Sequence, residues 1–120
     1  MSDVVVTVPK GLWAEWIKEG DLPGDLPGDM ESHFWLSGFQ MPVISRGDRV
    51  YVVAHGKLRG YAPLLRVELS CRLRDDRSCL VRNGNAVAVT IETPIRGFPG
   101  WRYRWWAREY EQPFPDWMRP

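Results

Sequence analysis

The residues with the clearest chemical potential lie toward the C-terminus, where basic and aromatic side chains alternate. The cluster consists of Arg96, Trp101, Arg102, Tyr103, Arg104, Trp106 and Arg108. Guanidinium groups contact phosphates and stack on rings, and aromatic side chains stack on bases with little sequence preference. The pattern therefore predicts a surface for single-stranded nucleic acid or a flipped base. The alternative is that the rings build the core and the arginines cover them.

Basic residues elsewhere could extend this surface. Lys10 lies near the start of an expected helix, where it could hold a phosphate together with the helix N-terminus. Further arginines would join the surface if their strands line up, namely Arg66, Arg72, Arg74 and Arg82. The residues that we predict to bind nucleic acid are Lys10, Lys57, Arg59, Arg96, Arg102, Arg104 and Trp106.

The sequence offers no recognisable set of catalytic residues. Nucleophilic catalysis needs a Ser, Cys or Thr beside a positioned base, and His33 and His55 are the only histidines. His55 stands at a predicted strand end, where a solvated turn histidine is the simpler interpretation. Glu68 and Glu92 are explained by cross-strand pairing with arginines. We therefore assign no catalytic residue.

The two cysteines, Cys71 and Cys79, could be joined by a disulfide or could share a metal. They could face each other across a hairpin and oxidise, but their spacing with the two histidines matches no common zinc module. We expect no metal and no cofactor. The few cysteines, and the lack of a signal peptide or a membrane-spanning apolar run, indicate a cytoplasmic protein with reduced thiols and no membrane partner.

Length and charge bound the remaining possibilities. The 120 residues fit a single domain over 1–120, and the net charge of +1 creates no overall field toward nucleic acid. The distribution is uneven, because residues 1–32 hold seven acids against two lysines, whereas residues 33–120 hold fourteen bases against eight acids. The basic part could face a polyanion, although a mixed solvated surface explains it equally well.

The hydrophobic pattern predicts a mainly β, α+β fold. We expect one helix over 12–19, because Leu12, Trp13, Trp16 and Ile17 follow i, i+1, i+4, i+5 spacing. Residues 21–29 repeat Asp-Leu-Pro-Gly and predict a solvated turn-rich loop, since their aspartates lack the spacing of a calcium loop. Strands are expected over 4–8, 33–36, 49–54, 58–73, 79–81, 87–91 and 101–106.

Local signals suggest how these strands connect. Pro63 indicates an edge strand or a bulge, and Asn83-Gly84 predicts a hairpin from 79–81 to 87–91. Trp105 and Trp106 are adjacent, so on a strand they point to opposite faces and at least one is exposed. Consecutive hairpins favour a small antiparallel barrel, over whose body the tail 107–120 packs irregularly.

Three segments in this order resemble the ASCH group of the PUA-like superfamily. They are Ile17-Lys18-Glu19-Gly20 at the helix end, Gly47-Asp48-Arg49-Val50-Tyr51-Val52-Val53, and Gly60-Tyr61-Ala62-Pro63-Leu64. Phe34-Trp35-Leu36 is similar to EVE domains of the same superfamily. The resemblance covers most of residues 4–92. It implies a PUA-like pseudo-barrel with a helix after the first strand.

The resemblance also implies a function. Members of the family are thought to bind RNA or modified bases, and a few are small amidohydrolases or ribonucleases. Their motif after the first helix is Gly-x-Lys-x-x-Glu-x-Arg. Here Gly20 matches the Gly, but Leu22 and Asp25 occupy the Lys and Glu positions. No catalytic residue is therefore carried over from the family.

Three functions remain open at this point. The first is a nucleic-acid-binding PUA/ASCH-like domain, with RNA favoured over DNA, or a nucleotide-like ligand. The second is a small hydrolase acting on a modified nucleoside or RNA, which would depend on Lys10, His55 or Glu68. The third is a protein-interaction module that uses the Trp-rich C-terminus. The sequence leaves the oligomeric state open.

Overall fold

The computed structural model describes residues 2–8, 11, 13, 31–35, 42–68, 79–83 and 86–119. The helix expected over 12–19, apart from Trp13, and the repeat loop over 21–29 lie outside these residues, as do Lys10 and Cys71. Within the described residues the fold is mainly β, as expected, and no helix there is long and apolar enough to cross a membrane. The one helix delimited in this part is a 3-10 turn, η2 (Arg108–Tyr110).

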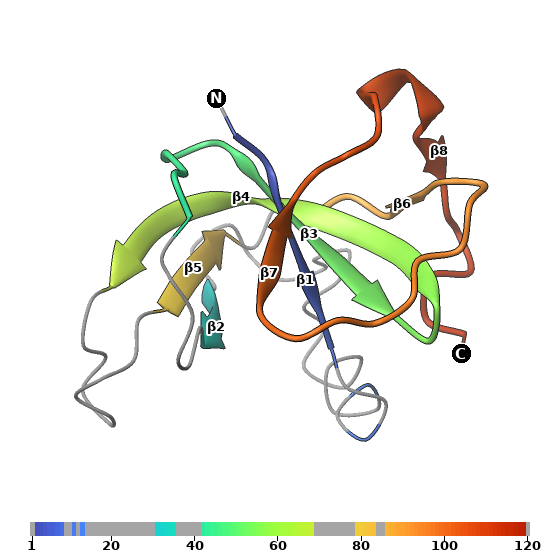
Figure 1. Ribbon diagram of the computed structural model, residues 1–120, viewed down its shortest axis with the longest axis horizontal. Helices are drawn as coiled ribbons and strands as arrows, with labels where there is room; N and C mark the ends of the chain where they lie inside the picture. Colours follow the sequence, from blue (N-terminus) through green and yellow to red (C-terminus); the bar gives the residue numbers. More distant parts are fainter. Residues whose placement is uncertain are drawn as a thin grey trace.

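Two sheets make up the described part (Figure 1). The larger sheet has the strand order β2-β5-β4-β3-β1-β7. Its strands are β1 (Val4–Thr7), β2 (Glu31–Trp35), β3 (Arg49–Ala54), β4 (Lys57–Glu68), β5 (Cys79–Asn83) and β7 (Trp101–Tyr103). The smaller sheet pairs β6 (Val89–Thr90) with β8 (Gln112–Pro113). The long, curved β4 runs through the whole molecule and connects the β2–β5 side to the β6–β8 side.

The larger sheet is mixed rather than antiparallel. β1 pairs with β3 in parallel, with Val4 opposite Val50 and Val6 opposite Val52, whereas β7 pairs with β1 antiparallel. The expected all-antiparallel pairing was wrong here because the hairpin argument applies to strands close in sequence. More than forty residues separate β1 from β3, which is ample for a crossover connection. Across its described strands the sheet is open, with β2 and β7 at its ends and no barrel closure.

The valine-rich strands at the centre of the sheet are buried on both faces. Val50 and Val52 pack in one cluster with Trp13 and Trp117, and the neighbouring Tyr51 packs on the opposite face. The expectation of a doubly buried strand over 49–54 is confirmed. Each valine side chain that moves from water into this core contributes roughly 1.5–3 kcal/mol to the free energy of folding. Burial in the two clusters therefore holds the strands that carry these valines in place.

The structure confirms the bulge expected near Pro63 and contradicts the hairpin expected after Asn83. Pro63 lies in the central strand β4, and an irregularity in the β4–β5 register falls directly after it, between Leu64 and Arg66. The bulge alternative is therefore the one observed. The predicted hairpin from 79–81 to 87–91 was wrong, since Val87 bridges to Tyr61 and Val89 pairs with Pro113. The physical reason is that β2 and β4 already occupy both sides of β5.

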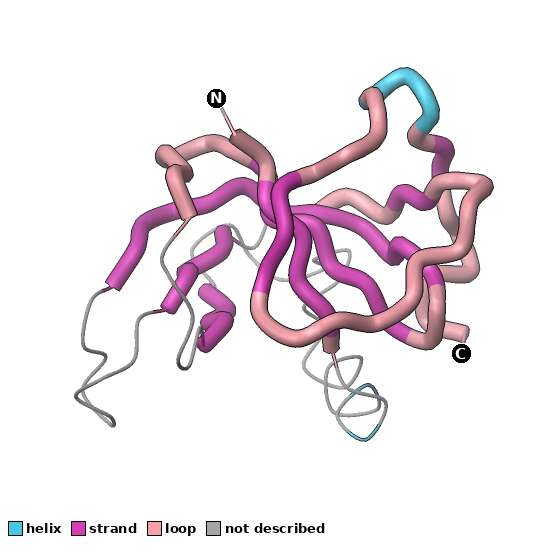
Figure 2. Tube along the Cα trace, viewed as in Figure 1, coloured by secondary structure: helices cyan, strands magenta, loops and turns pink. Residues whose placement is uncertain are grey.

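The C-terminal segment crosses the body in an ordered way. The Phe114 backbone N–H donates to the Ala88 carbonyl at 3.1 Å, and Trp117, only 6% exposed, belongs to the main core cluster. The indole N–H of Trp13 donates to the Met118 carbonyl at 3.1 Å. Figure 2 shows in pink the loops before and after β7, which carry Phe98, Trp105 and Trp106.

Candidate nucleic-acid interface

One face of the larger sheet aligns an arginine and two tyrosines across four strands. In register, Arg102 on β7 lies opposite Val5 on β1, Val5 lies opposite Tyr51 on β3, and Tyr51 lies opposite Tyr61 on β4. Residues paired across strands project from the same face of a sheet. The loops flanking β7 add Phe98, Trp105 and Trp106 near this face.

These rings form a continuous chain, which we call the aromatic row. Ring centroids are 6.3 Å apart for Phe98–Trp105, 5.0 Å for Trp105–Trp106, 5.2 Å for Trp106–Tyr51 and 5.2 Å for Tyr51–Tyr61. Each pair is tilted or edge-to-face, the arrangements that ring quadrupoles favour.

An arginine stacks on each end of the aromatic row. The Cζ atom of Arg102 lies 4.5 Å from the Phe98 ring centroid, and that of Arg49 lies 4.1 Å from the Tyr61 ring centroid. Both distances are within the range of a cation–π contact. The row therefore combines rings with guanidinium groups at its two ends.

Only part of the aromatic row reaches the surface. Tyr51 is fully buried, and Trp106 and Phe98 are 8% and 9% exposed, whereas Trp105 is 52% exposed. The prediction that at least one of the adjacent tryptophans is exposed is thus confirmed. The buried rings hold the Trp105 indole in place, and Arg102 is exposed beside it on Phe98. A fixed, half-exposed indole is the kind of ring on which a base stacks.

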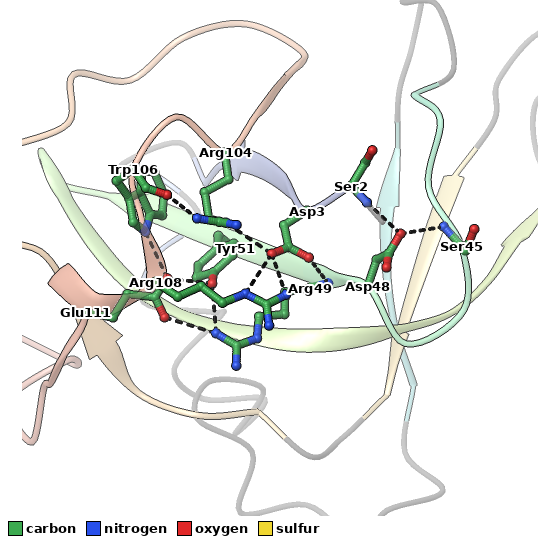
Figure 3. A network of polar contacts seen from close by, with 10 residues as sticks. All are labelled: Ser2, Asp3, Ser45, Asp48, Arg49, Tyr51, Arg104, Trp106, Arg108 and Glu111. Atoms are coloured by element: carbon green, nitrogen blue, oxygen red, sulfur yellow. Dashed lines mark hydrogen bonds and ion pairs between the residues drawn. The ribbon is translucent and has the colours of Figure 1, made fainter.

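A network of charges lies at the Arg49 end of the row (Figure 3). Buried Asp3 accepts hydrogen bonds from the Arg49 backbone N–H at 2.9 Å, from Arg104 Nε at 3.1 Å and from Arg108 Nη2 at 2.8 Å. Burial alone would raise the pKa of Asp3, but these hydrogen bonds outweigh it, and the pKa lies below its ordinary value. Asp3 is therefore a carboxylate that ties the start of β1 to the segment after β7.

Glu111 has the matching role in the buried part of the row. It accepts hydrogen bonds from the Tyr51 hydroxyl at 2.6 Å, from Arg49 Nη1 at 3.1 Å and from the Trp106 indole at 2.9 Å. Burial, and then the hydrogen bond to Glu111, raise the pKa of Tyr51 well above its usual range. Tyr51 is thus a neutral hydrogen-bond donor and not a base. Tyr51 and Glu111 therefore hold the neighbouring rings in position.

The predicted binding residues occupy different environments. Lys57, Arg96 and Arg102 are exposed, whereas Arg104 is partly exposed and donates to Asp3 and to the Trp106 carbonyl. Trp106 is buried within the row.

Arg59 is fully buried and has no route to an external ligand. Its Nε donates to the Ala54 carbonyl at 2.9 Å, and its Nη1 donates to the carbonyls of Trp117 and Arg119. The rings of Trp13 and Phe114 flank it, and desolvation lowers its pKa. This arginine anchors the C-terminal segment from inside.

Sequence reasoning left Trp105, Phe98, Arg49, Asp3 and Glu111 out of the predicted set. The Trp-Trp pair already indicated Trp105, and the i, i+2 spacing of Arg49 and Tyr51 placed both on one face of a strand. No sequence signal joined Asp3 to Arg108, because 105 positions separate them.

Two further features considered in the sequence fall partly within the described residues. His55 has a φ of 49° in the turn between β3 and β4, and its ring meets the edge of Trp13 at 6.3 Å. The described residues hold no group of three His, Cys, Asp or Glu that could bind a metal ion.

No family model matches this chain, and no curated protein or solved structure is significantly similar to it.

Proposed function

We propose that this chain binds single-stranded nucleic acid, with the base stacked on Trp105 and the adjoining phosphate held by Arg102. The observation that carries the proposal is that the exposed Trp105 indole and the Arg102 guanidinium both pack against Phe98. An aromatic face beside a guanidinium suits an unstacked base and its phosphate, and it reads no particular sequence. Exposed Arg96, in the loop before β7, adds positive charge close by in the sequence.

The proposal favours single strands over duplexes for a physical reason. Bases inside a duplex are stacked on their neighbours and cannot lie on an indole without unpairing. The preference for RNA over DNA rests on the resemblance to the ASCH group. We propose that relationship as well, supported by the mainly β fold and by the pairing of the first strand with the Val-rich β3, beside the Gly-Tyr-containing β4.

Fluorescence anisotropy of labelled oligonucleotides tests the proposal. Single-stranded RNA, single-stranded DNA and a duplex are titrated at two salt concentrations with wild type, Trp105→Ala and Arg102→Gln. We expect Trp105→Ala to lose about 1–3 kcal/mol of binding free energy. We expect Arg102→Gln to reduce the slope of log affinity against log salt by about one.

The chain offers a matched control for each variant. Tyr103 is 43% exposed and pairs with Val4. It therefore projects from the face of the sheet opposite to that of Arg102. The Arg119 side chain is 81% exposed, and its ion-pair partner is Asp116, outside the aromatic row. Tyr103→Ala and Arg119→Gln should therefore bind almost as wild type does. Equal losses in the control and test variants would overturn the assignment, and no binding to any single strand would overturn the function.

A further inference from the structure

In the charge network at the Arg49 end of the aromatic row, the acidic groups are buried and the basic groups are more exposed. Within the described part, the guanidinium groups of Arg49, Arg104 and Arg108 share two carboxylates, those of Asp3 and Glu111. The carboxylate side chains are 2% and 7% exposed, whereas Arg108 is 46% exposed and Arg49 is 25% exposed. In these ion pairs the carboxylates are therefore inside and the guanidinium groups reach toward solvent.

The two more exposed guanidinium groups belong to one network and bind different carboxylates in it. Arg49 donates to Asp3 through its backbone and to Glu111 through its side chain, and Arg108 donates to Asp3. The pKa of Arg108 is raised, first by its hydrogen bond to Asp3 and also by the nearby charges of Asp3 and Glu111. Figure 3 draws both arginines between Asp3 and Glu111.

Both groups keep donors for a ligand. A guanidinium has five N–H donors. Among the described contacts, Arg108 directs Nε and Nη2 to Asp3, and Arg49 directs Nη1 to Tyr51 and Glu111. The remaining N–H groups belong to side chains already held in one geometry. A held guanidinium loses little entropy when it binds an oxyanion.

We propose that Arg108 and Arg49 hold a second phosphodiester of the bound strand, beyond the nucleotide that stacks on Trp105. The inference rests on the proposed function and extends it, since Arg102 and Arg49 stack on opposite ends of the same aromatic row. A strand that crosses the surface above the row would place one of its phosphates at each end. The ligand is then an oligonucleotide, since the proposal needs two phosphates joined by one strand.

A length series tests this footprint. Labelled mono-, di-, tetra- and hexanucleotides of single-stranded RNA are titrated with wild type, Arg108→Gln, Arg102→Gln and the control Arg119→Gln. Wild-type affinity should rise with length. Arg108→Gln should keep its affinity for the shortest ligands, lose the gain on longer ones, and reduce the salt slope for the hexanucleotide by about one. Arg102→Gln should weaken binding at every length.

The outcomes separate the two claims. If Arg108→Gln follows the same length profile and salt slope as Arg119→Gln, the second phosphate contact is wrong while the proposed function stands. If wild type binds none of the ligands, the function fails first. Arg108→Lys keeps the charge beside Asp3 and should retain most of the salt slope. Circular dichroism of each variant checks whether the fold is intact. Inorganic phosphate is added as a competitor, and its complete displacement of the hexanucleotide at low concentration would indicate a free-phosphate site and overturn strand binding.

Discussion

Removing the charge of Glu111 should test whether the aromatic row depends on its buried carboxylate. The side chain is 7% exposed and accepts hydrogen bonds from Tyr51, Trp106 and Arg49. Breaking a buried ion pair on one side costs about 3–5 kcal/mol, because the partner charge is left without compensation. Arg49 is 25% exposed and partly solvated, and the amide oxygen of Glu111→Gln can still accept the two bonds that Tyr51 and Trp106 give to Oε2. We therefore expect a loss of about 2–4 kcal/mol in the free energy of unfolding.

Urea unfolding followed by tryptophan fluorescence measures this loss. Glu109→Gln is the matched control, since Glu109 lies in the 3-10 turn η2 that directly precedes Glu111 but is exposed, and it should change stability by less than about 0.5 kcal/mol. The double variant with Tyr51→Phe should show a coupling of about 0.5–3 kcal/mol, because the two groups share a 2.6 Å hydrogen bond. Strict additivity, or a Glu111 effect no larger than that of Glu109, would refute the reasoning.

Two more predictions concern the other buried charges. The folded pKa of Asp3 lies below its unfolded value near 3.8, so its stabilisation is present above that pH and is lost as the pH falls through the folded pKa. Asp3→Asn should therefore lower stability at neutral pH and flatten its decline below about pH 4 in a urea-unfolding series; an unchanged acid decline would contradict this. Arg59→Met keeps the bulk of the side chain but leaves the carbonyls of Trp117 and Arg119 without their donor. Limited proteolysis should then cut the C-terminal segment faster than in wild type or in the exposed control Lys57→Met, and equal rates would count against the anchor.

The sequence was informative where structure depends on neighbours along the chain. The strands at Val4–Thr7 and Arg49–Ala54 follow from β-branched runs whose burial is decided locally. The unequal exposure of Trp105 and Trp106 does not follow from the period of two of a strand, because β7 ends at Tyr103 and Trp106 is buried by its contacts with Tyr51 and Glu111. The parallel pairing of β1 with β3 does not follow from a local pattern either, because it depends on where a long connection returns the chain. The Asn83-Gly84 signal failed similarly, since a turn preference carries no information about which strands already flank β5.

The candidate site shows the same division between local and distant information. Arg102 was predicted from its neighbours and is exposed, whereas Arg59 carries the same kind of side chain and is fully buried. What distinguishes them is the C-terminal segment, whose carbonyls meet Arg59 from about sixty positions away. Arginine is among the residue types that are least often fully buried. Only the tertiary structure therefore reveals that Arg59 binds backbone carbonyls inside the protein.

The uneven charge of the sequence also acquires a specific meaning. Asp3 belongs to the acidic first part of the chain, and its partners Arg104 and Arg108 belong to the basic remainder. The attraction is therefore used partly inside the protein, where it fastens the segment after β7 to β1. That segment carries Trp105 and Trp106, and Glu111 holds the Trp106 ring against Tyr51. The buried charges thus set the position of the exposed indole, and a variant that loosens them should weaken binding without touching the ligand.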